Sequence, residues 1–163
     1  LLAQTDKPVV LDADGINALA GHMDEWERRR GRVTVLTPHE GEFLRVGGDL
    51  SQGRTAAAED FARRSGAVVV LKGPGTVVAG PDGRCRVNTT GNCGMAKGGS
   101  GDVLSGVVLA LLGLGMDAFD ACCCAVWLHG RAGDLAAQEK GQWGMTPTDL
   151  LERLPQALRE VTE

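Results

Sequence analysis

Short apolar runs recur along the first half of the chain, and polar or glycine residues follow each of them. They span residues 7–13, 33–36 and 67–71 and are rich in valine. Such runs are typical of strands buried on both faces of a parallel sheet. Two further short runs, 77–79 and 84–87, flank Pro81-Asp82-Gly83, which predicts an antiparallel hairpin around an Asp-Gly turn.

Between and after these runs the pattern changes to helical spacing. The expected helices span 14–20, 51–65, 103–114, 118–137 and 146–158. Gly66 is expected to end the second of them. The helix 103–114 is apolar almost all round, which predicts full burial. Strands that alternate with helices predict a single α/β domain over 1–163, with a mostly parallel sheet covered by helices on both faces.

The most informative stretch is 88–106, NTTGNCGMAKGGSGDVLSG. Gly98-Gly99-Ser100-Gly101 leads through Asp102 into an apolar helix. Glycines let a ligand approach the backbone, and the free N–H groups of a helix's first turn favour an anion. A carboxylate there suits a proton or metal beside a phosphate. The alternative is a flexible loop with an ordinary first-turn acid, but the density of glycine favours a phosphate cradle.

Polar residues follow the first two runs directly. Asp14 and Asn17 are candidate substrate contacts because ligands of α/β folds lie at the carboxyl ends of strands, although Asp14 is equally expected as a helix N-cap. After the second run, Thr37 can cap a helix, Pro38 can take its first position, and Glu40 can complete a capping box. That interpretation leaves His39 and Glu42 unexplained.

Lys72 follows the third run. It fits a solvated lysine at a strand end, and it equally fits a phosphate contact beside Gly73 and Gly75. The loop is no P-loop, because Gly-Lys-Ser/Thr occurs nowhere in the chain. His129 is interpreted as a packed histidine with its hydrogen bonds satisfied.

Composition narrows the functional classes. A net charge of −4 argues against a nucleic-acid surface, and Arg28-Arg29-Arg30 is interpreted as a solvated helix end. The sequence has no apolar stretch of transmembrane length and no signal-peptide layout at its start, so no membrane partner is expected. The five cysteines form no C-x-x-C pair and are interpreted as small apolar side chains in a reducing cytoplasm.

Three motifs together resemble one family. The stretch 88–106 resembles the signature of the ADP/ATP-dependent NAD(P)H-hydrate dehydratases, in the carbohydrate-kinase-related part of the ribokinase-like superfamily, with Cys93 where proline is usual. Residues 36–42 are similar to that family's LTPHxGE motif, and 72–76 to its KGxxT motif. A similar HGxAGD lies at 129–134.

The resemblance implies a three-layer α/β/α ribokinase-like fold and a lyase that repairs hydrated NADH or NADPH. In that family ADP or ATP phosphorylates the hydrate's hydroxyl, and phosphate then leaves. Asp102 would be the catalytic base, and Mg²⁺ is expected without an assignable ligand. The nucleotide contacts would be Lys72, Gly73, Pro74, Gly75, Thr76, Gly99, Ser100 and Gly101. The substrate contacts would be His39, Asp102, Asp14, Asn17 and Glu42.

The resemblance also implies that the N-terminal part of the domain is missing, because family members carry further sequence before the strand at 9–13. We therefore expect a homo-oligomer or association with the missing portion, since an incomplete sheet exposes an edge and apolar faces. Two alternative functions stay open. One is a ribokinase-like kinase of a small alcohol, and the other is an inactive nucleotide-binding module.

Overall fold

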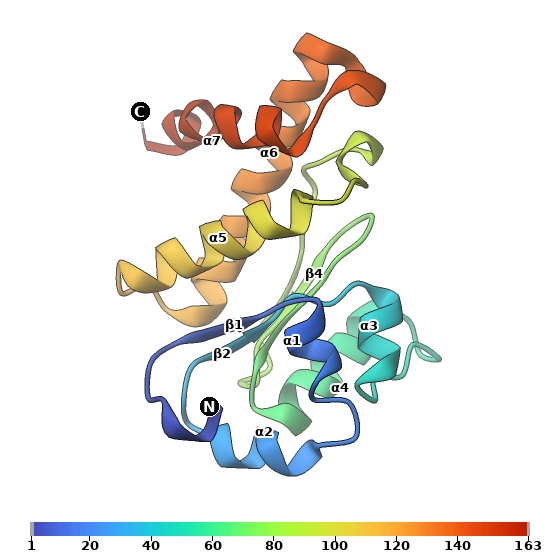
Figure 1. The fold of residues 1–163 in the computed structure, drawn as a ribbon, viewed down its shortest axis with the longest axis vertical. Coiled ribbons are helices and arrows are strands. Elements are labelled where there is room, and N and C mark those ends of the chain that lie inside the picture. Colours follow the sequence, from blue (N-terminus) through green and yellow to red (C-terminus); the bar gives the residue numbers. More distant parts are fainter. Residues whose placement is uncertain (1, 163) are drawn as a thin grey trace.

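The computed structural model describes residues 2–162. In that part of the chain the expected alternation of strands and helices is confirmed (Figure 1). The strands are β1 (Val9–Leu11), β2 (Thr34–Leu36), β3 (Val68–Leu71), β4 (Val77–Ala79) and β5 (Cys85–Val87). The helices are η1 (Leu2–Gln4), α1 (Asp14–Asn17), α2 (Met23–Arg29), α3 (Glu40–Arg45), α4 (Arg54–Ser65), η2 (Cys93–Met95), α5 (Ser100–Gly113), α6 (Ala118–Gly144) and α7 (Pro147–Thr162).

Within the described residues the strands form one sheet in the order β1-β2-β3-β4-β5. The first three strands are parallel, with Leu11 opposite Leu36 and Leu36 opposite Val69. β4 and β5 are antiparallel to their neighbours, as the turn at Asp82-Gly83 predicts. The chain reverses between β3 and β4 and again between β4 and β5. The carboxyl end of β5 therefore lies at the same end of the sheet as that of β3.

Alternate strand residues face opposite sides of the sheet, and helices cover both sides (Figure 1). Helices α1–α4 lie on one face, where the core contains Ile16, Trp26, Leu36, Phe43, Phe61, Val69 and Leu71. Helices α5 and α6 lie on the other, where the core contains Val35, Val70, Val78, Leu104, Val108, Cys122 and Ala125. The expected three-layer α/β/α arrangement is therefore confirmed.

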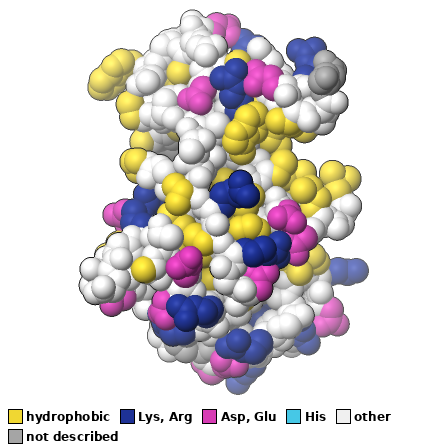
Figure 2. Space-filling model, turned by 180° about the vertical axis from the view of Figure 1, so that it is seen from behind, with side chains coloured by type: hydrophobic (Ala, Val, Ile, Leu, Met, Phe, Trp, Pro, Cys, Tyr) yellow, Lys and Arg dark blue, Asp and Glu magenta, His cyan; other side chains and the backbone are white. Residues whose placement is uncertain are grey.

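Helix α5 is not fully buried, so that prediction was wrong. Leu104, Val108 and Leu112 are buried, whereas Leu109 is 52% exposed, and Leu114, just beyond the helix, is 80% exposed. Only one side of α5 packs on the sheet and on α6, so its apolar composition overstates its burial. From behind, hydrophobic side chains gather at the surface in a band at the level of α5 and α6 (Figure 2).

The arginine cluster also differs from expectation. Arg28 and Arg30 are exposed and pair with acids on the same helix. Arg29 is buried, and its guanidinium donates to the hydroxyl of Thr34 and to the carbonyls of Leu2, Thr5, Lys7 and Val33. A planar group with five donors suits this set of acceptors, so Arg29 ties the first residues of the chain to β2.

Helix α6 continues past residue 137, but Gly141 interrupts it with a φ of 71°. A side chain is strained at such a φ, so glycine permits this change of direction. Helix α7 then packs back on α6 through a third cluster, which contains Leu128, Ala132, Leu135, Leu150 and Ala157. No helix within residues 2–162 is long and apolar enough to cross a membrane.

Candidate active site

The three parallel strands end at one edge of the sheet, and each is followed at once by a polar residue. Asp12 follows β1, Thr37 follows β2 and Lys72 follows β3. The N–H of Thr37 donates to the carbonyl of Leu11 at 3.1 Å, and that of Lys72 to the carbonyl of Pro38 at 2.8 Å. The hydrogen bonds between neighbouring strands therefore continue past Leu36 and Leu71. They hold these polar side chains in neighbouring positions.

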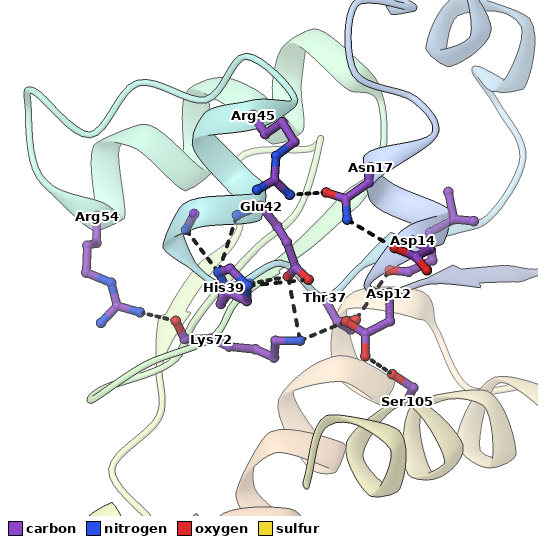
Figure 3. Close-up of polar contacts among 12 residues, drawn as sticks. Asp12, Asp14, Asn17, Thr37, His39, Glu42, Arg45, Arg54, Lys72 and Ser105 are labelled. Carbon is purple, nitrogen blue, oxygen red and sulfur yellow. Dashed lines mark hydrogen bonds and ion pairs between the residues drawn. The ribbon is translucent and has the colours of Figure 1, made fainter. Parts of the chain in front are cut away.

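Asp12 is the centre of this group (Figure 3). Its Oδ1 accepts a hydrogen bond from Nζ of Lys72 at 2.7 Å, and its Oδ2 accepts one from Oγ of Ser105 in α5 at 3.2 Å. Nζ of Lys72 also lies 3.9 Å from Oε2 of Glu42. Burial raises the pKa of Asp12, but the Lys72 ammonium and the Thr37 hydroxyl outweigh it and lower that pKa below its ordinary value.

The helix after β2 begins two residues later than expected, so the cap assigned to Thr37, Pro38 and Glu40 was wrong. His39 is the N-cap of α3, and its Nδ1 accepts from the N–H groups of Gly41 and Glu42 at 3.0 and 3.3 Å. Glu42 returns the interaction, with Oε2 accepting from the N–H of His39 at 2.8 Å. Because Nδ1 is an acceptor, the ring proton is on Nε2.

Asp14 is not a helix cap, and that alternative was wrong. The N-cap of α1 is Ala13, which has a φ of 46° and makes no side-chain cap. Asp14 begins α1 and instead accepts a hydrogen bond from Nδ2 of Asn17 at 3.4 Å. Oδ1 of Asn17 accepts in turn from Arg45 of α3 (Figure 3). Asp14 and Asn17 of α1 are thus joined to Arg45 of α3 in one polar chain.

The glycine-rich loop meets the same group from α5. Gly99 has a φ of 96° and precedes the first helical residue, Ser100. A Cβ placed on Gly101 would lie 3.2 Å from Oδ2 of Asp12 and 3.4 Å from Nζ of Lys72. The expected anion cradle and the expected phosphate lysine are therefore brought together. Asp102 is exposed in the first turn of α5.

The loop at Lys72–Thr76 is shaped by Arg54, a residue that sequence reasoning missed. The guanidinium of Arg54 donates to the carbonyls of Leu71 at 2.9 Å, Lys72 at 3.0 Å and Pro74 at 2.5 Å. Gly73 has a φ of 148°, and a Cβ there would lie 2.7 Å from Nη2 of Arg54. Thr76 closes the turn by donating its hydroxyl to the carbonyl of Gly73 at 3.1 Å.

The segment before the glycine loop is fastened to α6. Asp134 accepts from the N–H of Gly91 at 3.0 Å and from Nδ2 of Asn92 at 2.9 Å. Nε2 of His129 donates to the carbonyl of Ser100 at 2.9 Å, as expected for a packed histidine with a partner. Burial lowers the pKa of His129, and the nearby charge of Lys72 adds to this. The imidazole is therefore neutral at pH 7.

The N–H groups of the cradle are not equally available. The N–H of Ser100 donates to the carbonyl of Lys97 at 3.2 Å. The N–H of Gly101 lies in the first turn of α5, where a helix offers no internal acceptor. A hollow of about 190 Å³ lies between the β4–β5 hairpin and α6, lined by Val78, Arg86, Val87, Asn88, Thr89, Cys123, Val126 and Trp127.

Asp12, Ser105, Arg54 and Asp134 were not assigned roles from the sequence. Asp12 carried a usable signal, because it follows β1 as Lys72 follows β3. Ser105 lies one helical turn after Gly101 and so shares its face of α5. Arg54 and Asp134 act on backbone groups distant in sequence, and no local pattern marks them. Within residues 2–162 no three His, Cys, Asp or Glu side chains gather as a metal site.

Known proteins are similar to this chain over nearly its whole length. A family model described as NAD(P)H-hydrate dehydratase matches residues 1–156. The bifunctional NAD(P)H-hydrate repair enzyme Nnr of Thermofilum pendens is 46% identical over 167 residues, covering 100% of this chain and 32% of its own length. The ADP-dependent (S)-NAD(P)H-hydrate dehydratase of Neisseria meningitidis is 44% identical over 146 residues, covering 86% of this chain and 49% of its own.

Solved structures give the same result for the fold. The ADP/ATP-dependent NAD(P)H-hydrate dehydratase of Bacillus subtilis, co-crystallised with ATP and Mg²⁺, superposes with a TM-score of 0.82 at 34% identity. The match covers 97% of this chain and 56% of that one. A ribokinase-like superfamily protein of Enterococcus faecalis gives a TM-score of 0.82 at 27% identity, covering 98% of this chain and 55% of that one.

This chain therefore spans about a third of the bifunctional relative and half of the Neisseria one. The family match over residues 1–156 includes the elements from β1 to α6 and the first part of α7. The ribokinase-like fold, the glycine-rich helix start and the family match together establish that the chain belongs to the NAD(P)H-hydrate dehydratase family.

Proposed function

We propose that this chain carries the phosphoryl-transfer half of a nucleotide-dependent NAD(P)H-hydrate dehydratase. The observation that carries the proposal is the meeting of Gly101, Lys72 and Asp12 at one edge of the sheet. A glycine-rich helix start, a cation and a carboxylate are parts that phosphoryl transfer uses. The names of the relatives supply the substrate class.

In the proposed reaction the hydroxyl oxygen of hydrated NADH or NADPH attacks the terminal phosphorus of ADP or ATP. A P–O bond forms, the bridging P–O bond breaks, and AMP or ADP leaves. The carbon–oxygen bond of the ester then breaks, the adjacent carbon loses a proton, and the ring double bond returns with release of phosphate. Asp102 would accept the proton of the attacking hydroxyl.

Charge on the transferred group would be stabilised from two sides. The N–H of Gly101 lies in the first turn of α5 with the helix dipole behind it, and the ammonium of Lys72 lies 3.4 Å from the Cβ position of Gly101; both would supply this stabilisation. Gly73 to Thr76 would hold the nucleotide by backbone groups. Gly99 would contribute to the nucleotide site through its positive φ, which exposes the loop backbone. Ser100 would not offer its N–H to phosphate, because that group already donates to the carbonyl of Lys97.

The hydrated dinucleotide would approach from α1 and α3. Asp14, Asn17, His39 and Glu42 lie on this side of Asp12 (Figure 3). His39 uses Nδ1 for its helix cap, so only the Nε2–H side of the ring can serve a substrate. Glu42 is 6% exposed and already accepts from the N–H of His39, so we assign it mainly to orienting His39 and Lys72.

Mg²⁺ fits this donor set when it shares its ligands with phosphate. The ion prefers oxygen donors and commonly takes one or two carboxylates together with substrate phosphates. Asp12 is the carboxylate that would share the ion with phosphate, through Oδ2, which accepts a hydrogen bond from Ser105, whereas Oδ1 accepts one from Lys72. When bound, the ion would neutralise charge on the nucleotide phosphates. We also propose a cytoplasmic setting, because all five cysteines are free thiols.

We further propose that the outer side of α5 is covered in the working enzyme. Gly106 and Gly113 have open space beside them on this helix, next to exposed Leu109 and Leu114. β1 is the edge strand on the same side, and it packs under α5. The sequence that the relatives carry beyond the part matched here is one candidate to cover α5. A second copy of this chain is the other, and light scattering would detect it.

The test is an absorbance assay for regenerated NADH in the near ultraviolet. The chain is incubated with NADH hydrate, Mg²⁺ and either ADP or ATP. We expect turnover that Asp102→Asn removes and that Asp24→Asn, an exposed acid on α2, leaves intact. Nucleotide bound without turnover would instead favour a binding module. A stable phosphate ester of a small alcohol, formed without NADH hydrate, would favour a kinase.

A further inference from the structure

Lys97 makes an unusual set of contacts for an exposed lysine. Its Nζ donates to the backbone carbonyls of Gln142 at 3.4 Å, Trp143 at 3.1 Å and Met145. These carbonyls follow the interruption of α6 at Gly141, where the end of a helix carries partial negative charge. An ammonium has three hydrogens to donate, so one side chain satisfies three acceptors at once.

Other contacts seat the same two segments on each other. A Cβ on Gly94 would lie 2.6 Å from the carbonyl oxygen of Gln142, so the backbones touch there. Sγ of Cys93 donates to Oε1 of Gln142 at 2.8 Å. A Cβ on Gly99 would lie 3.2 Å from Cγ of Pro147. The strip 93–99 therefore rests along 142–147, with Lys97 as its charged contact.

Lys97 is also joined directly to the cradle. Its carbonyl accepts the N–H of Ser100 at 3.2 Å, which closes the turn that begins α5. Gly101, the residue that meets Asp12 and Lys72, comes next in the chain. The position of the cradle backbone is thus set from one side by β1 and β3 and from the other by the end of α6.

We propose that Lys97 is a positioning residue for the phosphate cradle. Its ammonium binds the carbonyls at the end of α6 and fixes the turn 97–100, so that the N–H of Gly101 is presented to a phosphate. The proposal rests on the proposed nucleotide site. It acts through the backbone of the turn, and Lys97 itself does not touch the nucleotide.

The first experiment measures the turn without any nucleotide. Amide hydrogen exchange is followed at 94–101 in the wild type, Lys97→Met, Lys97→Arg and Lys7→Met, an exposed lysine near the N-terminus. We expect exchange to rise about tenfold in Lys97→Met, since charged hydrogen bonds are lost, and to recover in part in Lys97→Arg. Unchanged exchange in Lys97→Met would overturn the proposal.

The second experiment separates positioning from simple loosening of the fold. Calorimetry gives the dissociation constants of ADP and of adenosine for the same proteins. Lys97→Met should weaken ADP about tenfold and adenosine less than about twofold, because the turn faces phosphate alone. Equal weakening of both ligands would overturn a role in phosphate positioning. If the wild type binds no ADP, the proposed nucleotide site fails, and the exchange experiment alone decides what Lys97 does to the turn.

Discussion

Nζ of Lys72 lies 2.7 Å from Oδ1 of Asp12, although 60 positions separate the two residues in the chain. The pair joins the ends of β1 and β3 across the end of β2. Both side chains are only partly exposed, 23% for Lys72 and 18% for Asp12. The ion pair therefore holds the proposed phosphate lysine ready in the absence of nucleotide.

This pair predicts coupled effects on stability. Lys72→Met and Asp12→Asn should each lower the free energy of unfolding by about 1–3 kcal/mol, since each leaves a half-buried group without its partner. The double variant should lose less than the sum of the two. Urea unfolding of all four proteins measures the coupling, and strictly additive losses would contradict it.

Gly101→Ala should weaken phosphate binding more than Gly106→Ala does. Its new methyl would stand 3.2 Å from Oδ2 of Asp12 and 3.4 Å from Nζ of Lys72, where the phosphate is expected. Gly106→Ala is the matched control, because it lies on the same helix and a Cβ there meets nothing within 4 Å. Gly106→Ala should raise the stability of α5 by roughly 0.5–1 kcal/mol, whereas in Gly101→Ala the close contact with Asp12 offsets this gain.

Calorimetry with ADP distinguishes the two variants. We expect Gly101→Ala to raise the dissociation constant by at least about tenfold, on the scale of an obstructed contact, and Gly106→Ala to leave it unchanged. Equal affinities for both variants would place the phosphate elsewhere.

His39 should show two separable roles. His39→Ala removes the acceptor that caps α3 and should cost about 0.5–2 kcal/mol of stability, whereas His39→Asn keeps a cap and should cost less. If Nε2–H also binds the hydrated dinucleotide, both variants should raise the KM for NADH hydrate. Thermal unfolding measures the capping role, and steady-state kinetics measure the substrate-binding role. A normal KM in His39→Asn would limit His39 to capping.

Stability should fall in acid through Asp149. Hydrogen bonds from Lys140 and Thr146 lower the pKa of Asp149 from 3.8 to about 2. A lowered pKa in the folded state means that this stabilisation is complete above pH 4 and is lost as pH falls toward 2. The slope of the urea midpoint against pH should therefore flatten in Asp149→Asn and in Lys140→Met. A wild-type slope in both variants would refute this assignment.

Cys93 should be the thiol that reacts first. It is exposed, while burial raises the pKa of Cys122 to about 12 and that of Cys123 to about 11. Reaction requires the thiolate, so a thiol reagent at pH 8 should label Cys93 before those two. Because Cys93 lies in the segment leading to the cradle, ADP should slow the labelling. Mass spectrometry with Cys93→Ser as control tests both statements.

Sequence reasoning was most successful where local chemistry decides the structure. Buried strands can be recognised as valine-rich runs, and the Asp82-Gly83 turn predicts the observed hairpin. Helix starts were harder, as α3 illustrates. Thr37 is fully buried, and its hydroxyl donates to the carbonyl of Leu11 at 3.3 Å, so β2 continues and the cap passes to His39. That outcome depends on a neighbouring strand, which no window around Thr37 contains.

In the candidate site, too, local patterns were easier to recognise than contacts between distant parts of the chain. The glycine loop and Lys72 could be proposed together because their spacing to a strand or helix is local, and the role of Asp102 stays a prediction. Asp12 gains its meaning only from Lys72 and Ser105, which lie 60 and 93 positions away. From the sequence Lys97 is an ordinary loop lysine, because its backbone acceptors lie 45 to 48 positions away in the chain. The exposed side of α5 escaped prediction because apolar content does not reveal which neighbour covers a helix.

The hairpin β4–β5 has a consequence for engineering. Its turn lies at the opposite end of the sheet from Lys72, yet the hairpin delivers the chain to Asn88, whose N–H donates to the carbonyl of Thr76 at 2.8 Å. Strand residues alternate between faces, so adding residues in matched pairs to both strands moves only the turn. The turn at Asp82-Gly83 is therefore a place where a fluorescent or affinity tag can be inserted at a distance from the chemistry.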